Sequence, residues 1–190
     1  SGVTGFKIGD VVSIVPPIDQ GKYGVYGEIA TVPSKFVVKH PSMLSFEEAA
    51  AVWMQYITAY GALIDIASIV KGDYVVITAA SSSVGLAAIQ LCNSVGAIPI
   101  ATTRTHSKKN ALLKAGAHAV IVTQEEDIAS KIKELTMQKG ARIVFDPVGG
   151  PLVLPLSEGM ADGGILFQYG ALSPDSTPFP LITALSKSLT

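Results

Sequence analysis

Cysteine is almost missing from this sequence: Cys92 is the only one among 190 residues. A single thiol can form neither an intrachain disulfide nor a cysteine-rich zinc cluster, so we expect no metal centre of that kind. Disulfides belong to oxidising compartments, and their exclusion here favours a cytoplasmic location.

Charge is also scarce. Charged residues make up 15% of the chain and the net charge is −1, so no overall field attracts nucleic acid or an anionic membrane. Polar residues interrupt every apolar stretch before the length of about 20 residues that a membrane-spanning helix needs. We therefore expect neither a nucleic-acid partner nor a membrane partner.

The composition otherwise predicts a folded chain. Hydrophobic residues make up 48%, enough to build a core, and 190 residues accommodate one domain and part of another. The chain opens on SGVTGFKIGD with no initiator Met and closes on PLITALSKSLT, which begins a helix where a further strand should follow. We expect a piece of a longer protein.

The first part of the chain is predicted to be β-rich. Apolar and β-branched residues indicate strands at 11–15 and 27–32, with turn residues supplied by PPIDQGKYG between them. A helix should begin at Ser45, with Glu48 as its capping-box partner. It should run towards Ala67. The alternative is two helices, because Thr58 and Tyr60 are weak helix formers and interrupt the stronger ones.

After Val70 the pattern alternates between apolar, β-branched runs and helical segments, which is typical of βαβ units. Right-handed crossovers would give an α/β fold with a doubly wound parallel sheet. The expected strands cover 74–78, 98–102, 119–122, 142–146 and 164–169, and the expected helices cover 84–95, 108–115, 126–139 and 151–160.

The turn between the strand at 74–78 and the next helix is a candidate phosphate site. Small residues fill 79–83, and unpaired amides at the start of a helix favour an anion. The usual dinucleotide fingerprint is incomplete, because serines replace the first glycines and only Gly85 remains. An ordinary strand-to-helix connection is the alternative.

The end of the next strand favours NADP(H) over NAD(H). An NAD site usually has an acidic residue there for the ribose hydroxyls, whereas this sequence has no acidic residue from Tyr74 to Gln124. Arg104, Lys108 and Lys109 follow the strand instead, and an arginine fork suits a 2′-phosphate. The alternative is a solvated basic start of a helix.

Taken together, the motifs resemble the medium-chain dehydrogenase/reductase superfamily along essentially the whole chain. They occur in the family's order: KIGDVV, GKYGVYGEIATVP, LSFEEAAAV, YITAYGAL, AASSSVG, FDPVGG and YGALS. The resemblance implies the C-terminal, β-rich tail of a GroES-like catalytic domain at 1–44. A Rossmann dinucleotide-binding domain, ending before its last strand, would occupy 45–190.

The resemblance also implies a zinc-free branch, similar to quinone oxidoreductases and enone or enoyl reductases. Zinc-dependent relatives have a zinc-binding Cys four residues before the Thr that matches Thr58, where this sequence has Met54, a poor zinc ligand. The cysteine-rich lobe that such relatives carry after KIGDVV is also missing. The implied reaction is hydride transfer from NADPH to a quinone, an enone or a related carbonyl compound.

By the same resemblance, eleven residues would bind the cofactor. Ser82, Ser83 and Val84 would line the pyrophosphate; Thr103, Arg104 and Lys108 would meet the adenosine phosphate; Thr58 and Val148 would approach the nicotinamide side, and Gly170, Ala171 and Leu172 would close over it. The partners implied are a small-molecule substrate and a second copy of the chain in a homodimer. A non-catalytic, crystallin-like NADPH-binding protein is the alternative.

The sequence identifies no catalytic acid or base. His40, His106 and His118 are scattered without carboxylate or cysteine neighbours at ligand spacing, so we expect surface or packing roles for them. Asp146, at the end of a predicted strand, is expected to be structural.

Overall fold

The computed structural model describes residues 2–15, 19 and 21–190. The chain divides into two compact units, Ser1–Ile57 and Thr58–Thr190. The division falls within helix α1 (Phe46–Tyr60) rather than before it. Each unit is described by itself.

The first unit contains a two-stranded antiparallel sheet. Strand β1 (Val12–Ile14) pairs with β2 (Val37–Lys39), which directly follows a 3-10 turn at Ser34–Phe36. The strand expected at 27–32 is wrong: those residues form no strand, and Ile29 is 92% exposed. Among the described residues β1 pairs with β2 instead, so the apolar segment 27–32 has no partner strand. The predicted turn residues 16–18 and 20 lie outside the described residues.

Helix α1 begins as its sequence predicts. Ser45 Oγ accepts a hydrogen bond from Glu48 N at 3.2 Å, and Glu48 Oε2 accepts one from Ser45 N at 2.9 Å. This reciprocal capping box satisfies two amides that a helix otherwise leaves unpaired. The helix passes through Thr58 and Tyr60 without a break and continues as a π-helical segment, Gly61–Ile66.

The second unit is built on a five-stranded parallel sheet, which confirms the expected α/β fold. The strand order is β5-β4-β3-β6-β7, so the chain starts in the middle, builds one side and returns to build the other. Such an order creates a switch point between β3 and β6. The strands are β3 (Tyr74–Ile77), β4 (Ile98–Thr103), β5 (Ala119–Val122), β6 (Ala141–Asp146) and β7 (Met160–Gln168).

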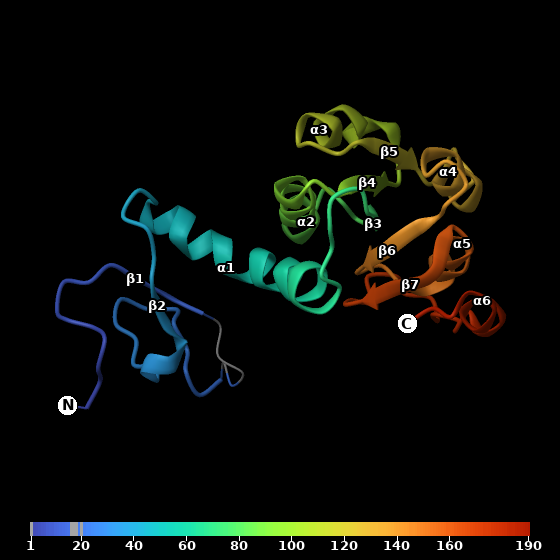
Figure 1. Cartoon of the computed structure of the whole chain (residues 1–190). Coiled ribbons are helices and arrows are strands. Elements are labelled where there is room, and N and C mark those ends of the chain that lie inside the picture. The colour runs from blue at the N-terminus through green and yellow to red at the C-terminus, as the bar shows by residue number, and fades with distance from the viewer. Residues whose placement is uncertain (1, 16–18, 20) are drawn as a thin grey trace. The chain divides into compact units, whose positions relative to one another are not determined.

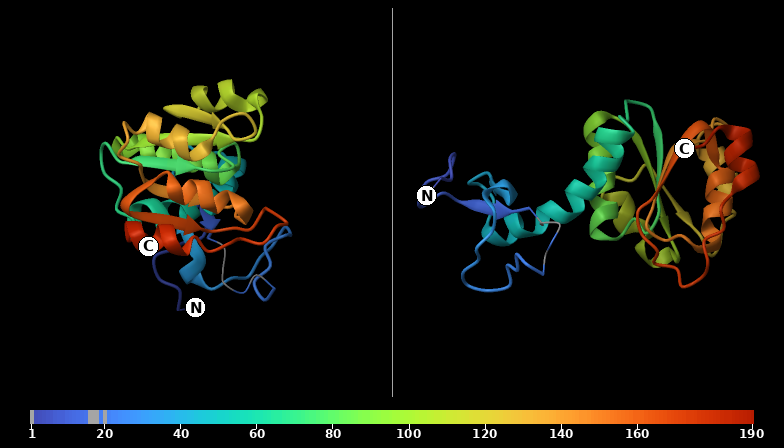
Figure 2. Two further views of the ribbon diagram at one scale, coloured as in Figure 1. Left: turned by 90° about the vertical axis from the view of Figure 1, so that its right-hand side faces the viewer. Right: turned by 90° about the horizontal axis from the view of Figure 1, so that it is seen from below.

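Helices cover both faces of this sheet, as Figures 1 and 2 show. One face carries α2 (Ser83–Val95), which packs on β3 and β4; the other carries α4 (Ile128–Leu135) and α5 (Val153–Glu158). Beneath α4 and α5, apolar side chains from all five strands form a buried cluster with Ile132 and Leu156. Burial on both faces explains why the strands are continuous apolar runs.

Several predicted helix bounds are too long, for local reasons. The helix expected at 126–139 is only α4, because Asp127 accepts from Ser130 N at 2.8 Å as its N-cap and Met137 and Gln138 leave the helix with positive φ. The helix expected at 108–115 is a 3-10 turn, His106–Lys108, followed by α3 (Lys109–Lys114).

The strand expected at 164–169 starts earlier, at Met160. The helix expected at 151–160 therefore shortens to a 3-10 turn, Gly150–Leu152, and α5. The glycines in MADGG resemble a turn, but they are accommodated inside β7, where the pairing with β6 shifts register and Gly163 takes a φ of 69°.

The chain ends beside β7. After α6 (Leu181–Lys187), Thr190 N donates to Gly164 O at 3.0 Å and Leu166 N donates to Thr190 O at 2.8 Å. This is the hydrogen-bond pattern of a parallel strand pair. Within the described ranges, no helix combines the length and the apolar character needed to cross a membrane.

Candidate functional site

A cavity of about 780 Å³ opens at the carboxyl ends of the five strands of the second unit. Every strand contributes, through its last residues or the loop that follows it. In open α/β sheets, ligands bind at this edge, beside the switch point. The cavity is lined by Ala79, Ser81, Thr102, Thr103, Arg104, Thr105, Lys108, Thr123, Gln124, Val148, Leu152, Leu172, Ser173 and Pro174.

One side of the cavity is basic and polar. Arg104 follows β4 directly, and Lys108 ends the 3-10 turn after it. Lys108 Nζ donates to Ser81 Oγ at 3.2 Å, so it bridges from the end of β4 to the turn after β3. None of the lining residues is acidic. This side is therefore suited to an anion, and the planar fork of Arg104 is suited to a phosphate.

The turn after β3 packs closely against the start of α2. Ser82 Oγ accepts from Gly85 N at 3.1 Å and caps α2. A Cβ at Gly85 would lie 2.6 Å from the Cα and the O of Ala80, so only glycine fits where the helix meets the turn. The helix start and its dipole thus lie next to Ser81 and the basic side of the cavity.

The opposite side of the cavity is largely apolar and comes from the loops after β6 and β7. It is formed by Val148, Leu152, Leu172 and Pro174, with the hydroxyl-bearing Ser173 among them. A cavity with one basic side and one apolar side suits a ligand that combines phosphate with a flat, poorly charged ring system.

The structure brings together five of the eleven residues predicted to bind a cofactor: Thr103, Arg104, Lys108, Val148 and Leu172. Val148, expected on the nicotinamide side, shares one cavity with Arg104. The other six lie outside the lining: Ser82, Ser83 and Val84 in the start of α2, Gly170 and Ala171 just before Leu172, and Thr58 in α1.

Besides Thr102 and Thr105, which flank the predicted Thr103 and Arg104, the sequence prediction omitted four polar lining residues. Ser81 stands in the turn that was singled out, but was treated as a missing glycine. Thr123 and Gln124 follow β5, and Ser173 follows β7. Their shared feature is their position after a strand's carboxyl end, which could have identified them.

No general acid or base emerges at this edge. The hydroxyl of Tyr169 is buried without a hydrogen-bond partner, and its ring stacks on Phe145 at 4.1 Å. Burial, and next the charge of Asp146, raise the pKa of Tyr169 well above its ordinary value, so the phenol stays protonated. Burial also raises the pKa of Cys92 to about 12. In the described parts of the chain, no three His, Cys, Asp or Glu residues gather as a metal site would need.

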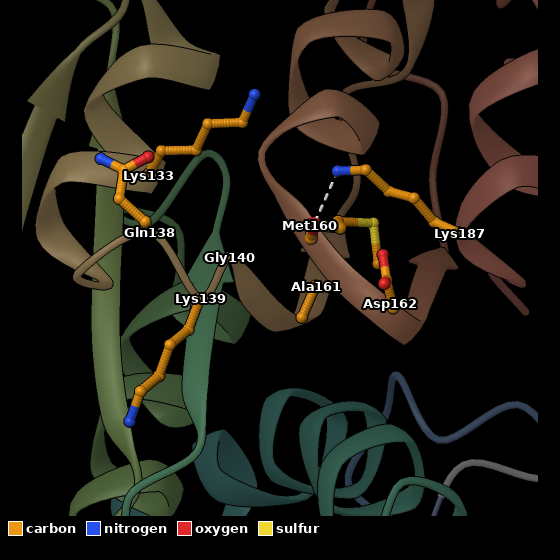
Figure 3. A pocket seen from close by; sticks show the side chains of 8 residues that line it. All are labelled: Lys133, Gln138, Lys139, Gly140, Met160, Ala161, Asp162 and Lys187. Atoms are coloured by element: carbon orange, nitrogen blue, oxygen red, sulfur yellow. Dashed lines mark hydrogen bonds between the residues drawn. The ribbon is translucent and has the colours of Figure 1, made fainter.

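A second cavity, of about 450 Å³, lies at the opposite edge of the sheet, near the first residues of β6 and β7 (Figure 3). Lys187 is occupied there, since its Nζ donates to the carbonyls of Glu158 and Met160, both at 2.7 Å. Figure 3 shows Lys139 pointing away from Lys187. Lys139 therefore does not join Lys133 and Lys187, and Asp162 adds a negative charge to the lining, so this cavity offers less to an anion than the first. It is lined by Lys133, Gln138, Lys139, Gly140, Met160, Ala161, Asp162 and Lys187.

Comparison with known proteins bears on both the fold and the cavity. A model of the zinc-binding dehydrogenase family matches residues 83–190. The synaptic vesicle membrane protein VAT-1 homolog of Homo sapiens is 37% identical over 149 residues, which are 78% of this chain and 36% of that protein. Quinone oxidoreductase 1 of Escherichia coli (strain K12) is 36% identical over 149 residues, which are 78% of this chain and 44% of that enzyme.

A solved structure is similar too. The crystal structure of Escherichia coli quinone oxidoreductase complexed with NADPH matches with a TM-score of 0.74 and 32% identity, over 82% of this chain and 48% of that one. The chain thus spans between about a third and half of the length of these relatives.

Proposed function

This chain belongs to the zinc-binding dehydrogenase family, in the quinone oxidoreductase-like part of the medium-chain dehydrogenase/reductases, and from that premise we propose that it is the NADP(H)-binding portion of an oxidoreductase. The observation that carries the proposal is the cavity at the carboxyl edge of the sheet, where Arg104 and Lys108 face no acidic residue. The Escherichia coli relative solved with NADPH supports the same ligand.

The residues present fit this cofactor. The extra phosphate of NADP(H) needs a cationic group and hydrogen-bond donors, which Arg104, Lys108 and the hydroxyl of Ser81 provide on one side of the cavity. The pyrophosphate needs backbone amides at the start of a helix, and we assign it to those of Ser83 and Val84 in α2, because the amide of Gly85 already donates to Ser82 Oγ. The apolar side, with Val148 and Leu172, leaves room for a ring system.

The chain's own residues bind and orient rather than react. When bound, the cofactor supplies the hydride. Arg104 and Lys108 hold the adenosine end by charge, the start of α2 holds the diphosphate, and the loops after β6 and β7 shield the cavity from water. No proton transfer is assigned to a residue of this chain.

We assign the hydride acceptor to the class of quinones, enones and related carbonyl compounds. The support is the likeness to quinone oxidoreductase 1 and the position of Met54, where zinc-dependent relatives would have a cysteine. Zinc independence, a cytoplasmic location and a homodimer remain predictions from the sequence.

The proposal is tested by replacing Arg104 in the full-length protein. Titrations that follow the fluorescence of reduced nicotinamide should show tighter binding of NADPH than of NADH. Arg104→Ala should weaken NADPH binding roughly 10- to 100-fold, because it removes a charge-assisted hydrogen bond to the phosphate. NADH lacks that phosphate, so its binding should change no more than about threefold. Lys114→Ala removes the same charge from an exposed site on α3 and is the matched control.

The outcomes separate the alternatives. A wild-type preference for NADH, or equal NADPH affinity in Arg104→Ala, would contradict the cofactor assignment. NADPH oxidation with a quinone or an enone, unchanged by a chelator, supports the reductase. Tight NADPH binding without oxidation across a broad acceptor panel would instead support the non-catalytic, crystallin-like protein.

A further inference from the structure

Asp146 is a fully buried carboxylate at the end of β6, and its exposed fraction is 0%. No lysine, arginine or histidine of the described residues pairs with it. A buried charge without a counter-ion has to be stabilised by hydrogen bonds. Three donors do so: the Thr78 hydroxyl to Oδ1, Val148 N to Oδ1 at 2.9 Å and Gly149 N to Oδ2 at 2.9 Å.

The two backbone donors belong to the turn at 147–150, and the same turn uses its carbonyls in the other direction. Pro147 O accepts from Leu172 N at 3.0 Å, and Val148 O accepts from Ser173 N at 2.8 Å. The amide N–H groups of the turn thus donate to the carboxylate of Asp146, and its carbonyl groups accept from the loop after β7. Val148, Leu172 and Ser173 all line the cavity.

There is little space for the turn and the loop to slip past one another. Gly149 and Gly150 have φ angles of 67° and 64°, and a Cβ at Gly150 would lie 2.4 Å from Ser173 Oγ. A Cβ at Gly170 would lie 2.8 Å from Pro147 O. Gly150 N also donates to Thr177 Oγ1 at 2.8 Å. Turn and loop therefore move as one body, which Asp146 fixes to the sheet.

We propose that Asp146 is a positioning residue for the dinucleotide: it holds the apolar wall of the cavity, formed by the 147–150 turn and the 170–174 loop, at a fixed distance from the basic wall at Arg104 and Lys108. Asp146 touches no ligand and acts through Val148, Leu172 and Ser173. The inference rests on the proposed function, since it concerns the same cavity.

The test is Asp146→Asn in the full-length protein. The amide keeps one acceptor oxygen but turns an N–H towards a backbone N–H, so one of the two turn contacts is lost. We expect the dissociation constants of NADPH and NADH to rise together by about tenfold, with their ratio unchanged because the basic wall is intact. Hydrogen–deuterium exchange should increase at 148–150 and 172–173, and not across the rest of the sheet.

A buried hydroxyl far from the cavity supplies the control. Thr136 accepts from Gly140 N at 2.9 Å near the end of α4. Thr136→Val should lower the melting temperature and leave both dissociation constants within about twofold, because the folded fraction stays near one well below the transition.

If Asp146→Asn fails to fold, Thr177→Val tests the link between turn and loop without changing a buried charge. It should weaken both dinucleotides about threefold at an unchanged ratio. Unchanged dissociation constants in the folded variant, or a collapsed NADPH-to-NADH ratio, would overturn the proposal for Asp146. A wild-type protein that binds neither dinucleotide would instead overturn the proposed function.

Discussion

Replacing Gly85 by alanine should damage both the stability and the cofactor site. The added Cβ would lie 2.6 Å from Ala80 Cα and O and 2.7 Å from Ala80 C. Carbon atoms in contact normally lie about 3.5–4.0 Å apart, so the start of α2 or the preceding turn would have to move by roughly 1 Å. All three atoms belong to the backbone of Ala80, so no flexible side chain can move aside instead.

The magnitude follows from that overlap. Overpacking of a well-packed site costs about 1–3 kcal/mol, and a clash with backbone belongs at the upper end. With roughly 2–4 °C of melting temperature per kcal/mol for a chain of this size, Gly85→Ala should melt about 6–12 °C lower. NADPH affinity should fall as well, because the displaced amides at the start of α2 are those proposed to meet the pyrophosphate.

The assay is thermal unfolding followed by circular dichroism, combined with fluorescence titration of NADPH. Gly61→Ala is the matched control, because a Cβ there meets nothing within 4 Å and its φ is not positive. Removing a helical glycine should leave stability unchanged or raise it by about 0.5–1 kcal/mol. If Gly85→Ala melted within about 1 °C of wild type and bound NADPH equally well, the close approach of α2 to the turn would be refuted.

Two further predictions concern local features of α2. Ser82→Ala should cost about 1 kcal/mol, seen as a melting temperature roughly 2–4 °C lower, because its Oγ accepts from Gly85 N, whereas Ser83→Ala should leave the melting temperature unchanged. Burial raises the pKa of Cys92 from 9.0 in an unfolded chain to about 12, so above pH 9 the unfolded state loses a proton that the folded state keeps. Wild type should therefore lose roughly 1 kcal/mol per pH unit between pH 9 and 11 relative to Cys92→Ala in chemical denaturation, and a constant difference across that range would contradict the burial of the thiol.

The sequence predicted the second unit better than the first, for a physical reason. Strands such as β3 and β6 are covered on both faces, so each is a continuous apolar run in the sequence. Such a run can be recognised as a strand without knowing which strand it pairs with. The order of strands and helices then follows from chain connectivity. The capping box at Ser45 and Glu48 was also predictable, because it involves only residues three apart.

The strand pairing in the first unit was not predictable from local pattern. The segment 27–32 has the apolar, β-branched character of a strand, but pairing requires a partner, and β1 pairs with 37–39 instead. Similarly, the glycines in β7 favour a turn by themselves, and they stay within the strand as an irregularity because Met160 and Ile165 on either side of them pair with β6. In both cases a non-local contact outweighs local propensity.

From the residue types alone, the lining of the cavity was predictable where charge marks it, whereas Thr103, Val148 and Leu172 came from the family resemblance. Arg104 and Lys108 could be identified because charge is rare in this region. The position of Ser81 after β3 could have marked it as a lining residue, but its hydrogen bond with Lys108 could not be predicted, because it depends on Lys108 reaching across the sheet edge.

The serines in the turn after β3 do not weaken the case for a phosphate site, because the glycines of the usual fingerprint serve different purposes. The position that cannot accept a Cβ, next to the Ala80 backbone, retains its glycine, Gly85. The position at the helix start holds Ser82, which caps α2 as glycine could not. The position facing Lys108 holds Ser81, which adds a hydroxyl on the basic side of the cavity. Ser81 and Ser82 therefore fall where a side chain has a hydrogen-bond partner, and only the amide of Gly85 is taken up by the cap, so we expect the amides of Ser83 and Val84 to serve the anion.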